Sequence, residues 1–115
     1  MSKITEVILD TINKYKKINY SPYDINNGLC GEFATTVIDK MKGISDEKCI
    51  PLVSVDDEIT HCWVYCNGKH YDSEVPNGVD NWTELPLAKR NLKPKQRWEQ
   101  LKVFGKRLKL KDLVI

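Results

Sequence analysis

The chain has 115 residues, of which 41% are hydrophobic and 30% charged, and this size and balance predict one compact domain. No run of 18 apolar residues occurs, so neither a membrane-spanning helix nor a membrane partner is expected. The N-terminal sequence MSKITEVILD lacks the cleavage site of a signal peptide. This favours a cytoplasmic protein whose four cysteines are reduced.

Charge is distributed unevenly along the chain. Residues 1–88 hold 8 Lys/Arg and 14 Asp/Glu, whereas residues 89–115 hold 10 Lys/Arg and 2 Asp/Glu. Two interpretations of this basic C-terminal segment stay open: a solvated face of the domain, or a docking surface for an acidic partner. No sequence signature of nucleic-acid binding accompanies the segment, so nucleic acid is not the expected partner.

The predicted elements, in chain order, form a single α+β domain over residues 1–115. Apolar spacing predicts helices over residues 3–17 and 30–42, with Gly43 ending the second, and a loop between them. Strands are predicted over residues 49–55, 59–66 and 69–73, the last two joined as a hairpin. A short helix near residues 84–91, a helix over 95–104 and a C-terminal edge strand follow. The N-terminal helices are expected to pack on the small antiparallel sheet.

The hairpin predicts which side chains lie together. Asn67 and Gly68 favour a two-residue type I′ turn, which would pair Trp63 with Asp72. Because side chains alternate along a strand, His61 and Trp63 share one face with Asp72. His61 and Asp72 are then diagonal neighbours within reach of an imidazole–carboxylate hydrogen bond.

Two histidines and two cysteines in this hairpin also raise the question of a zinc site. A tetrahedral site needs four converging ligands, but His61 and His70 face away from Cys62 and Cys66. Cys62 and Cys66 are also about 13 Å apart at the rise of a strand. We therefore expect no metal and no other cofactor, and we interpret these two cysteines as small buried apolar residues.

Cys30 occupies a different position, at the start of the helix predicted over residues 30–42. A helix N-terminus carries partial positive charge that stabilises a thiolate, and its free N–H groups can bind an oxyanion. Gly28 and Gly31 on either side leave room for a substrate carbonyl. Alternatively, Cys30 begins the buried stripe that continues with Phe33 and Ala34. Both interpretations hold if only the first turn of the helix reaches the surface.

Together these segments resemble the papain-like and transglutaminase-like superfamily, most closely its transglutaminase-like branch and related bacterial and phage cysteine hydrolases. GLCGEFA is similar to the G-x-C-x-x-F/Y-A pattern of that branch, and HCWVYCNGKHYD is similar to its H-x-W-V…G…Y-D pattern. The resemblance covers about residues 26–76. It implies a papain-like or transglutaminase-like core with Cys30 as nucleophile, His61 as general base and acid, and Asp72 as the orienting acid.

The resemblance also implies a second oxyanion donor from a side-chain amide before the nucleophile. Asn26 and Asn27 are the candidates, although either also suits a turn or a cap. Trp63 is expected either to shield the histidine–aspartate pair or to belong to the core. In the loop after the hairpin, Glu74 and Trp82 are candidates for lining the substrate site, and Trp82 alternatively anchors this loop on the core.

These residues predict an enzyme that forms a thioester acyl-enzyme on Cys30. It would act as a peptidase, amidase, deamidase or transglutaminase-like acyl transferase on a protein or peptide-like substrate. The short chain leaves little sequence for substrate subsites, and fold similarity alone does not choose among these reactions. The alternative is a non-catalytic binding or inhibitor protein, for instance phage-encoded, that engages an acidic partner through residues 89–115.

Overall fold

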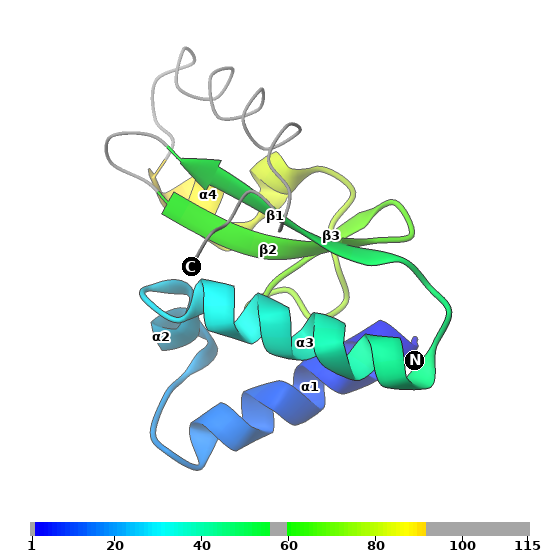
Figure 1. Cartoon of the computed structure of the whole chain (residues 1–115). Helices are drawn as coiled ribbons and strands as arrows, with labels where there is room; N and C mark the ends of the chain where they lie inside the picture. The colour runs from blue at the N-terminus through cyan, green and yellow to red at the C-terminus, as the bar shows by residue number, and fades with distance from the viewer. Residues whose placement is uncertain (1, 56–59, 92–115) are drawn as a thin grey trace.

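The computed structural model describes residues 2–55 and 60–91, which form an α+β fold with a three-stranded antiparallel sheet of order β1-β2-β3 (Figure 1). In chain order the elements are α1 (Lys3–Lys16), α2 (Pro22–Asn26), α3 (Cys30–Ile44), β1 (Cys49–Val55), β2 (Thr60–Cys66), β3 (Lys69–Tyr71), the 3-10 helix η1 (Trp82–Glu84) and α4 (Pro86–Asn91). The helix predicted over residues 95–104, the C-terminal edge strand and most of the basic segment lie outside the described residues. None of the helices in the described part is long and apolar enough to cross a membrane.

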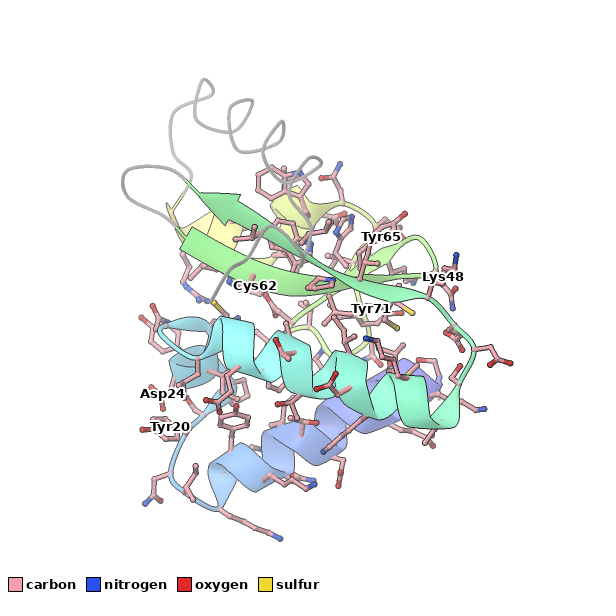
Figure 2. The ribbon with its side chains drawn as sticks, in the orientation of Figure 1. Tyr20, Asp24, Lys48, Cys62, Tyr65 and Tyr71 are labelled. Atoms are coloured by element: carbon pink, nitrogen blue, oxygen red, sulfur yellow. The ribbon has the colours of Figure 1, made fainter. Side chains whose placement is uncertain are left out.

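Helices α1 and α3 cover one face of the sheet, and α3 lies directly on β1 and β2 (Figure 1). Their apolar stripes recur at helical spacing and meet alternate residues of β2, namely Cys62, Val64 and Cys66. Figure 2 shows Cys62 and Tyr71 on this helix-facing side and Tyr65 on the other. The main core therefore lies between the helical layer and the sheet.

The opposite face of the sheet is covered by the chain that follows the hairpin. Leu52 and Trp63, which are direct partners in the β1–β2 register, pack with Trp82, Leu85 and Leu87. The rings of Trp63 and Trp82 stack with centroids 5.7 Å apart and planes 16° from parallel. Trp82 is buried in this second cluster, so it anchors its loop on the core and does not line an open site.

The hairpin has the predicted turn. Asn67 and Gly68 both have positive φ angles, 52° and 80°, as a type I′ turn requires. The register pairs Cys66 with Lys69, Tyr65 with His70 and Val64 with Tyr71. The prediction of this hairpin and its register is confirmed, but β3 ends at Tyr71, two residues earlier than predicted.

The segment predicted as a loop before Cys30 contains a short helix, so that prediction is wrong. Ser21 and Asp24 form a reciprocal capping box at the start of α2, and Pro22 occupies the first turn, where its missing N–H costs nothing. The predicted end of α3 at Gly43 is also wrong. The helix continues to Ile44 and ends where Ser45 becomes extended.

Candidate active site

His61 and Asp72 are joined by a buried hydrogen bond. Nε2 of His61 lies 3.0 Å from Oδ2 of Asp72, and the two residues are only 3% and 2% exposed. Strand β2 supplies the histidine, and the aspartate directly follows β3, so the hairpin register sets their separation. The predicted proximity of the two side chains is confirmed.

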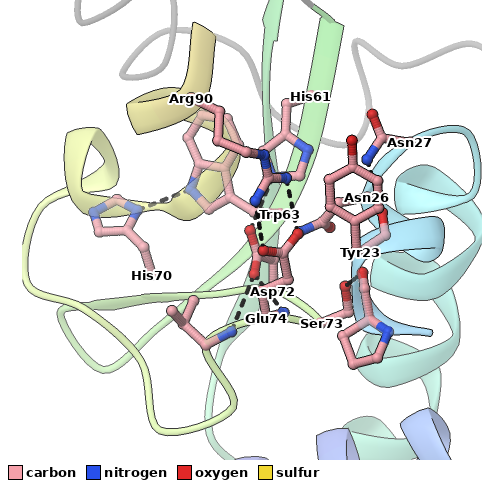
Figure 3. A network of polar contacts seen from close by, with 12 residues as sticks. Tyr23, Asn26, Asn27, His61, Trp63, His70, Asp72, Ser73, Glu74 and Arg90 are labelled. Carbon is pink, nitrogen blue, oxygen red and sulfur yellow. Dashed lines mark hydrogen bonds and ion pairs between the residues drawn. The ribbon is translucent and has the colours of Figure 1, made fainter. Parts of the chain in front are cut away.

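Asp72 is itself held by the backbone that follows it. Its second oxygen, Oδ1, accepts hydrogen bonds from the N–H groups of Glu74 at 2.8 Å and Val75 at 3.2 Å (Figure 3). These bonds bend the chain away from β2, which explains why β3 stops at Tyr71. They also leave Oδ2 directed at the imidazole.

Cys30 reaches this pair from the first turn of α3. The helix packs on the face of the sheet that carries Cys62, whereas strand alternation places His61 on the other face, stacked on Trp63. Beyond the end of β3, no described strand pairs with this side of β2. Groups from both faces of the sheet can therefore come together at this edge of β2. In the hairpin register the N–H of Cys62 points to this edge, and this N–H group helps to lower the pKa of the Cys30 thiol.

The start of α3 adds a further donor. Leu29 at the N-cap has no polar side chain, so no side-chain cap occupies the N–H groups of the first turn. The N–H of Gly31 also helps to lower the pKa of the Cys30 thiol. One N–H group from a helix and one from a strand thus both favour the thiolate form of Cys30.

Cys30 and His61 shift each other's pKa. Burial by itself raises the pKa of the Cys30 thiol, but hydrogen bonding and charge from His61, together with the two backbone donors, lower it below its ordinary value. Burial by itself lowers the pKa of His61, but its hydrogen bonds with Asp72 and Cys30 raise it to about 9. Both shifts favour a thiolate beside an imidazolium, the charged state of an activated cysteine nucleophile.

The second ring nitrogen of His61, Nδ1, is not used by Asp72. Nε2 is taken by Asp72, and Nδ1 is buried with no partner of ordinary hydrogen-bond geometry among the described residues. The thiol of Cys30 contributes to the raised pKa of His61, and Nδ1 is the ring nitrogen that Asp72 leaves open. The other thiols differ from that of Cys30, because burial raises the pKa of Cys49 and Cys66 and raises that of Cys62 to about 12.

Trp63 covers the imidazole on one side. Its ring stacks on His61 with centroids 5.7 Å apart, and it is only 1% exposed. Its indole N–H donates to Nδ1 of His70 at 2.8 Å, which fixes the rotation of the indole (Figure 3). Both roles predicted for Trp63 are therefore compatible with its position, since it is a core residue and also excludes water from His61.

Glu74 joins the two segments that flank the histidine–aspartate pair. Its carboxylate accepts two hydrogen bonds from Arg90 of α4, at 2.7 and 2.9 Å, and one from Nδ2 of Asn26 at 3.1 Å (Figure 3). The guanidinium of Arg90 also lies 4.8 Å from the ring centre of Tyr23. Glu74 therefore links α2 to α4 at the border of the site.

Both asparagines that precede Cys30 use their amide groups elsewhere. Nδ2 of Asn27 donates to the carbonyl of Tyr23 at 2.8 Å, which makes Asn27 a turn residue at the end of α2. Asn26 is 3% exposed and donates to Glu74, while its Oδ1 has no partner among the described residues. Both amide nitrogens therefore have a partner other than Cys30.

Two parts of this site were not predicted from the sequence. Arg90 belongs by composition to the basic C-terminal segment, and nothing in the sequence links it to Glu74, 16 residues earlier. The N–H of Cys62 is left without a partner strand because β3 ends at Tyr71, and the sequence did not predict that end. A capping signal, Ser21 with Pro22 and Asp24, was present for α2, which carries Asn26 to the site.

Within residues 2–55 and 60–91, no three His, Cys, Asp or Glu side chains are grouped so that they could hold a metal ion. Comparison with family models, with curated proteins and with solved structures finds no match to this chain.

Proposed function

We propose that the chain is a small cysteine hydrolase or acyl transferase of the papain-like and transglutaminase-like type, acting on a protein or peptide-like substrate. The observation that carries this proposal is the buried 3.0 Å bond between His61 and Asp72, and the imidazole of this pair lowers the pKa of the Cys30 thiol. The order of the three residues and the parts of the fold that supply them fit the resemblance noted in the sequence. A mere scaffold would have no need of a buried imidazole held between a carboxylate and a thiol.

In the first half of the reaction, the thiolate of Cys30 attacks the carbonyl carbon of an amide or thioester. The carbonyl oxygen becomes an oxyanion, and the N–H of Cys62 and those of the first turn of α3 are its donors. As the tetrahedral intermediate collapses, the bond to the leaving group breaks and His61 gives that group its proton. A thioester on Cys30 remains.

In the second half, a nucleophile attacks the thioester carbonyl. His61, now neutral, takes the proton from an attacking water or amine, and Cys30 leaves as thiolate. Water completes hydrolysis or deamidation, and an amine completes acyl transfer. Asp72 accepts the Nε2–H throughout and keeps Nδ1 directed at the reacting atoms.

Acylation by a chromogenic thioester or activated ester tests the proposal without knowledge of the natural substrate. We expect a rapid burst of one leaving group per chain and an acyl mass increase on Cys30 alone. Cys30→Ser should abolish the burst and His61→Ala should slow it strongly. Cys62→Ser, which keeps the backbone donor, is the matched control. Slow, equal modification of all four cysteines would instead favour the binding-protein alternative.

A further inference from the structure

A second pair of cysteines, Cys49 and Cys66, has no part in the proposed reaction. Both are free thiols, and their sulfur atoms lie 2.7 Å apart, closer than the van der Waals contact of two sulfurs. They face the helical layer at the end of β2 opposite His61, so they form a site distinct from Cys30. Two thiols in direct contact on neighbouring strands are candidates for a disulfide bond.

The backbone register suits a bond between these sulfurs. Cys66 borders the two-residue turn, so its N–H and carbonyl point toward β3, and its pairing with Cys49 on β1 is of the non-hydrogen-bonded kind. In such pairs the Cα atoms are about 4.5 Å apart, inside the range found for disulfides. Pro51, paired with Val64, is of the same kind, and its missing N–H then falls on the outer edge of β1, as proline requires.

The surroundings of the two thiols give them different roles. Cys66 is fully buried, whereas Cys49 is partly exposed at the start of β1, so an oxidant in solution meets Cys49 first. Oε2 of Glu47 lies 3.6 Å from the sulfur of Cys66 and also accepts a hydrogen bond from Asn67. This carboxylate is positioned to take the proton of Cys66.

We propose that Cys49 and Cys66 form a reversible cross-strand disulfide when the chain meets a small disulfide oxidant such as oxidised glutathione. The thiolate of Cys49 attacks one sulfur of the oxidant, forms a mixed disulfide and releases one reduced glutathione. Cys66 then loses its proton to Glu47 and attacks the sulfur of Cys49, and the second glutathione leaves. Two protein thiols are oxidised and one glutathione disulfide is reduced to two thiols. The bond links β1 to β2 and does not involve Cys30.

The full chain treated with excess oxidised glutathione, quenched in acid and digested without reduction tests the proposal. Trypsin alone leaves Cys49, Cys62 and Cys66 in one peptide, so cleavage after the acidic residues 56–58 and after the aromatic residues 63 and 65 is also needed. We expect a linked pair of peptides carrying Cys49 and Cys66, lost on treatment with dithiothreitol. Cys30→Ser and Cys62→Ser should keep the link.

Each partner variant has its own expected outcome. In Cys66→Ser the mixed disulfide on Cys49 has no second thiol to resolve it, so one glutathione should stay bound there. Cys49→Ser should lose the link, and its buried Cys66 should react slowly. Two results with the wild-type chain would overturn the proposal. One is glutathione retained on Cys49 with no disulfide to Cys66, and the other is a disulfide that joins Cys62 instead.

Discussion

His61 and Asp72 are held together across the hairpin by one hydrogen bond of 3.0 Å, and each is fixed from a second direction. Oδ1 of Asp72 holds two backbone N–H groups, and the ring of His61 lies against Trp63. The imidazole cannot turn about its axis without losing the bond at Nε2. This arrangement fixes the orientation of the imidazole before any substrate binds, and it leaves Nδ1 free of Asp72.

Asp72→Asn should leave the fold intact but lower the acylation rate on the order of 10³-fold or more. The amide oxygen can still accept from the N–H groups of Glu74 and Val75, so the amide nitrogen would face Nε2 of His61. Nε2 must then act as acceptor and Nδ1 carries the proton, so the imidazole cannot accept the thiol proton. Burst kinetics with an activated ester measure this loss. Asp80→Asn, at an exposed position, is the control, and wild-type acylation by the Asp72 variant would remove Asp72 from the mechanism.

The pH dependence of Cys30 alkylation should show a low thiol pKa that depends on His61. A lowered pKa keeps the thiolate populated as pH falls below the ordinary thiol range, and reactivity is lost only below the shifted value. The raised pKa of His61, about 9, keeps the imidazolium present until pH rises through that value, where the ion pair is lost. Iodoacetamide rates at pH 6–10, with peptide mapping of each cysteine, measure the profile.

His61→Ala supplies the comparison for that profile. Without the imidazolium, burial is left as the largest influence, so the pKa of Cys30 should rise and its labelling at pH 6–7 should become slow. Cys49 and Cys66 serve as internal references because burial raises their pKa values. Equal profiles for Cys30 in the two proteins would show that His61 does not activate the thiol.

Local signals in the sequence account for the correct part of the predicted site. The Asn67–Gly68 turn and the two-residue period of β2 are properties of neighbouring residues, and together they place His61 beside Asp72. Helix α3 begins at Cys30, as its apolar stripe and preceding glycine indicate.

Other parts depend on long-range contacts or on the exact end of an element. Had β3 continued to residue 73, the N–H of Cys62 would pair within the sheet and could not lower the pKa of the Cys30 thiol. That end is set by the carboxylate of Asp72, which captures two N–H groups of the following turn. The contact of Cys49 with Cys66 likewise depends on the β1–β2 register, which no tight turn specifies.

Trp63→Ala should lower the free energy of unfolding by about 3–5 kcal/mol, because it leaves a large cavity between the sheet and Trp82. Trp63→Phe keeps a ring over His61 but loses the N–H bond to His70, at a cost of about 1–3 kcal/mol. Urea denaturation measures both. Tyr65→Phe, on the same face but half-buried, is the control. A Trp63→Ala variant as stable as the Tyr65 variant would contradict the packing described for this face.

Asn26→Ala distinguishes a structural amide from an oxyanion donor. If Asn26 stabilised the oxyanion, its loss would cost about 10²- to 10³-fold in the acylation rate. In the structure its Nδ2 donates to Glu74, which is also bound by Arg90, and two backbone N–H groups help to lower the pKa of the Cys30 thiol. We therefore expect a loss of about 1 kcal/mol in the free energy of unfolding and an acylation rate changed by only a few-fold.

Asn27→Ala is the matched control for Asn26→Ala, because Asn27 is exposed and its amide only closes the turn at the end of α2. Unfolding and burst kinetics are measured on the same preparations, so that a loss of folded protein is not mistaken for a slower reaction. A rate loss of 10²-fold or more in a stable Asn26→Ala variant would assign the oxyanion to its side chain. It would also mean that the amide turns from Glu74 toward Cys30 when substrate binds, leaving Arg90 as the only side chain that holds Glu74 among the described residues.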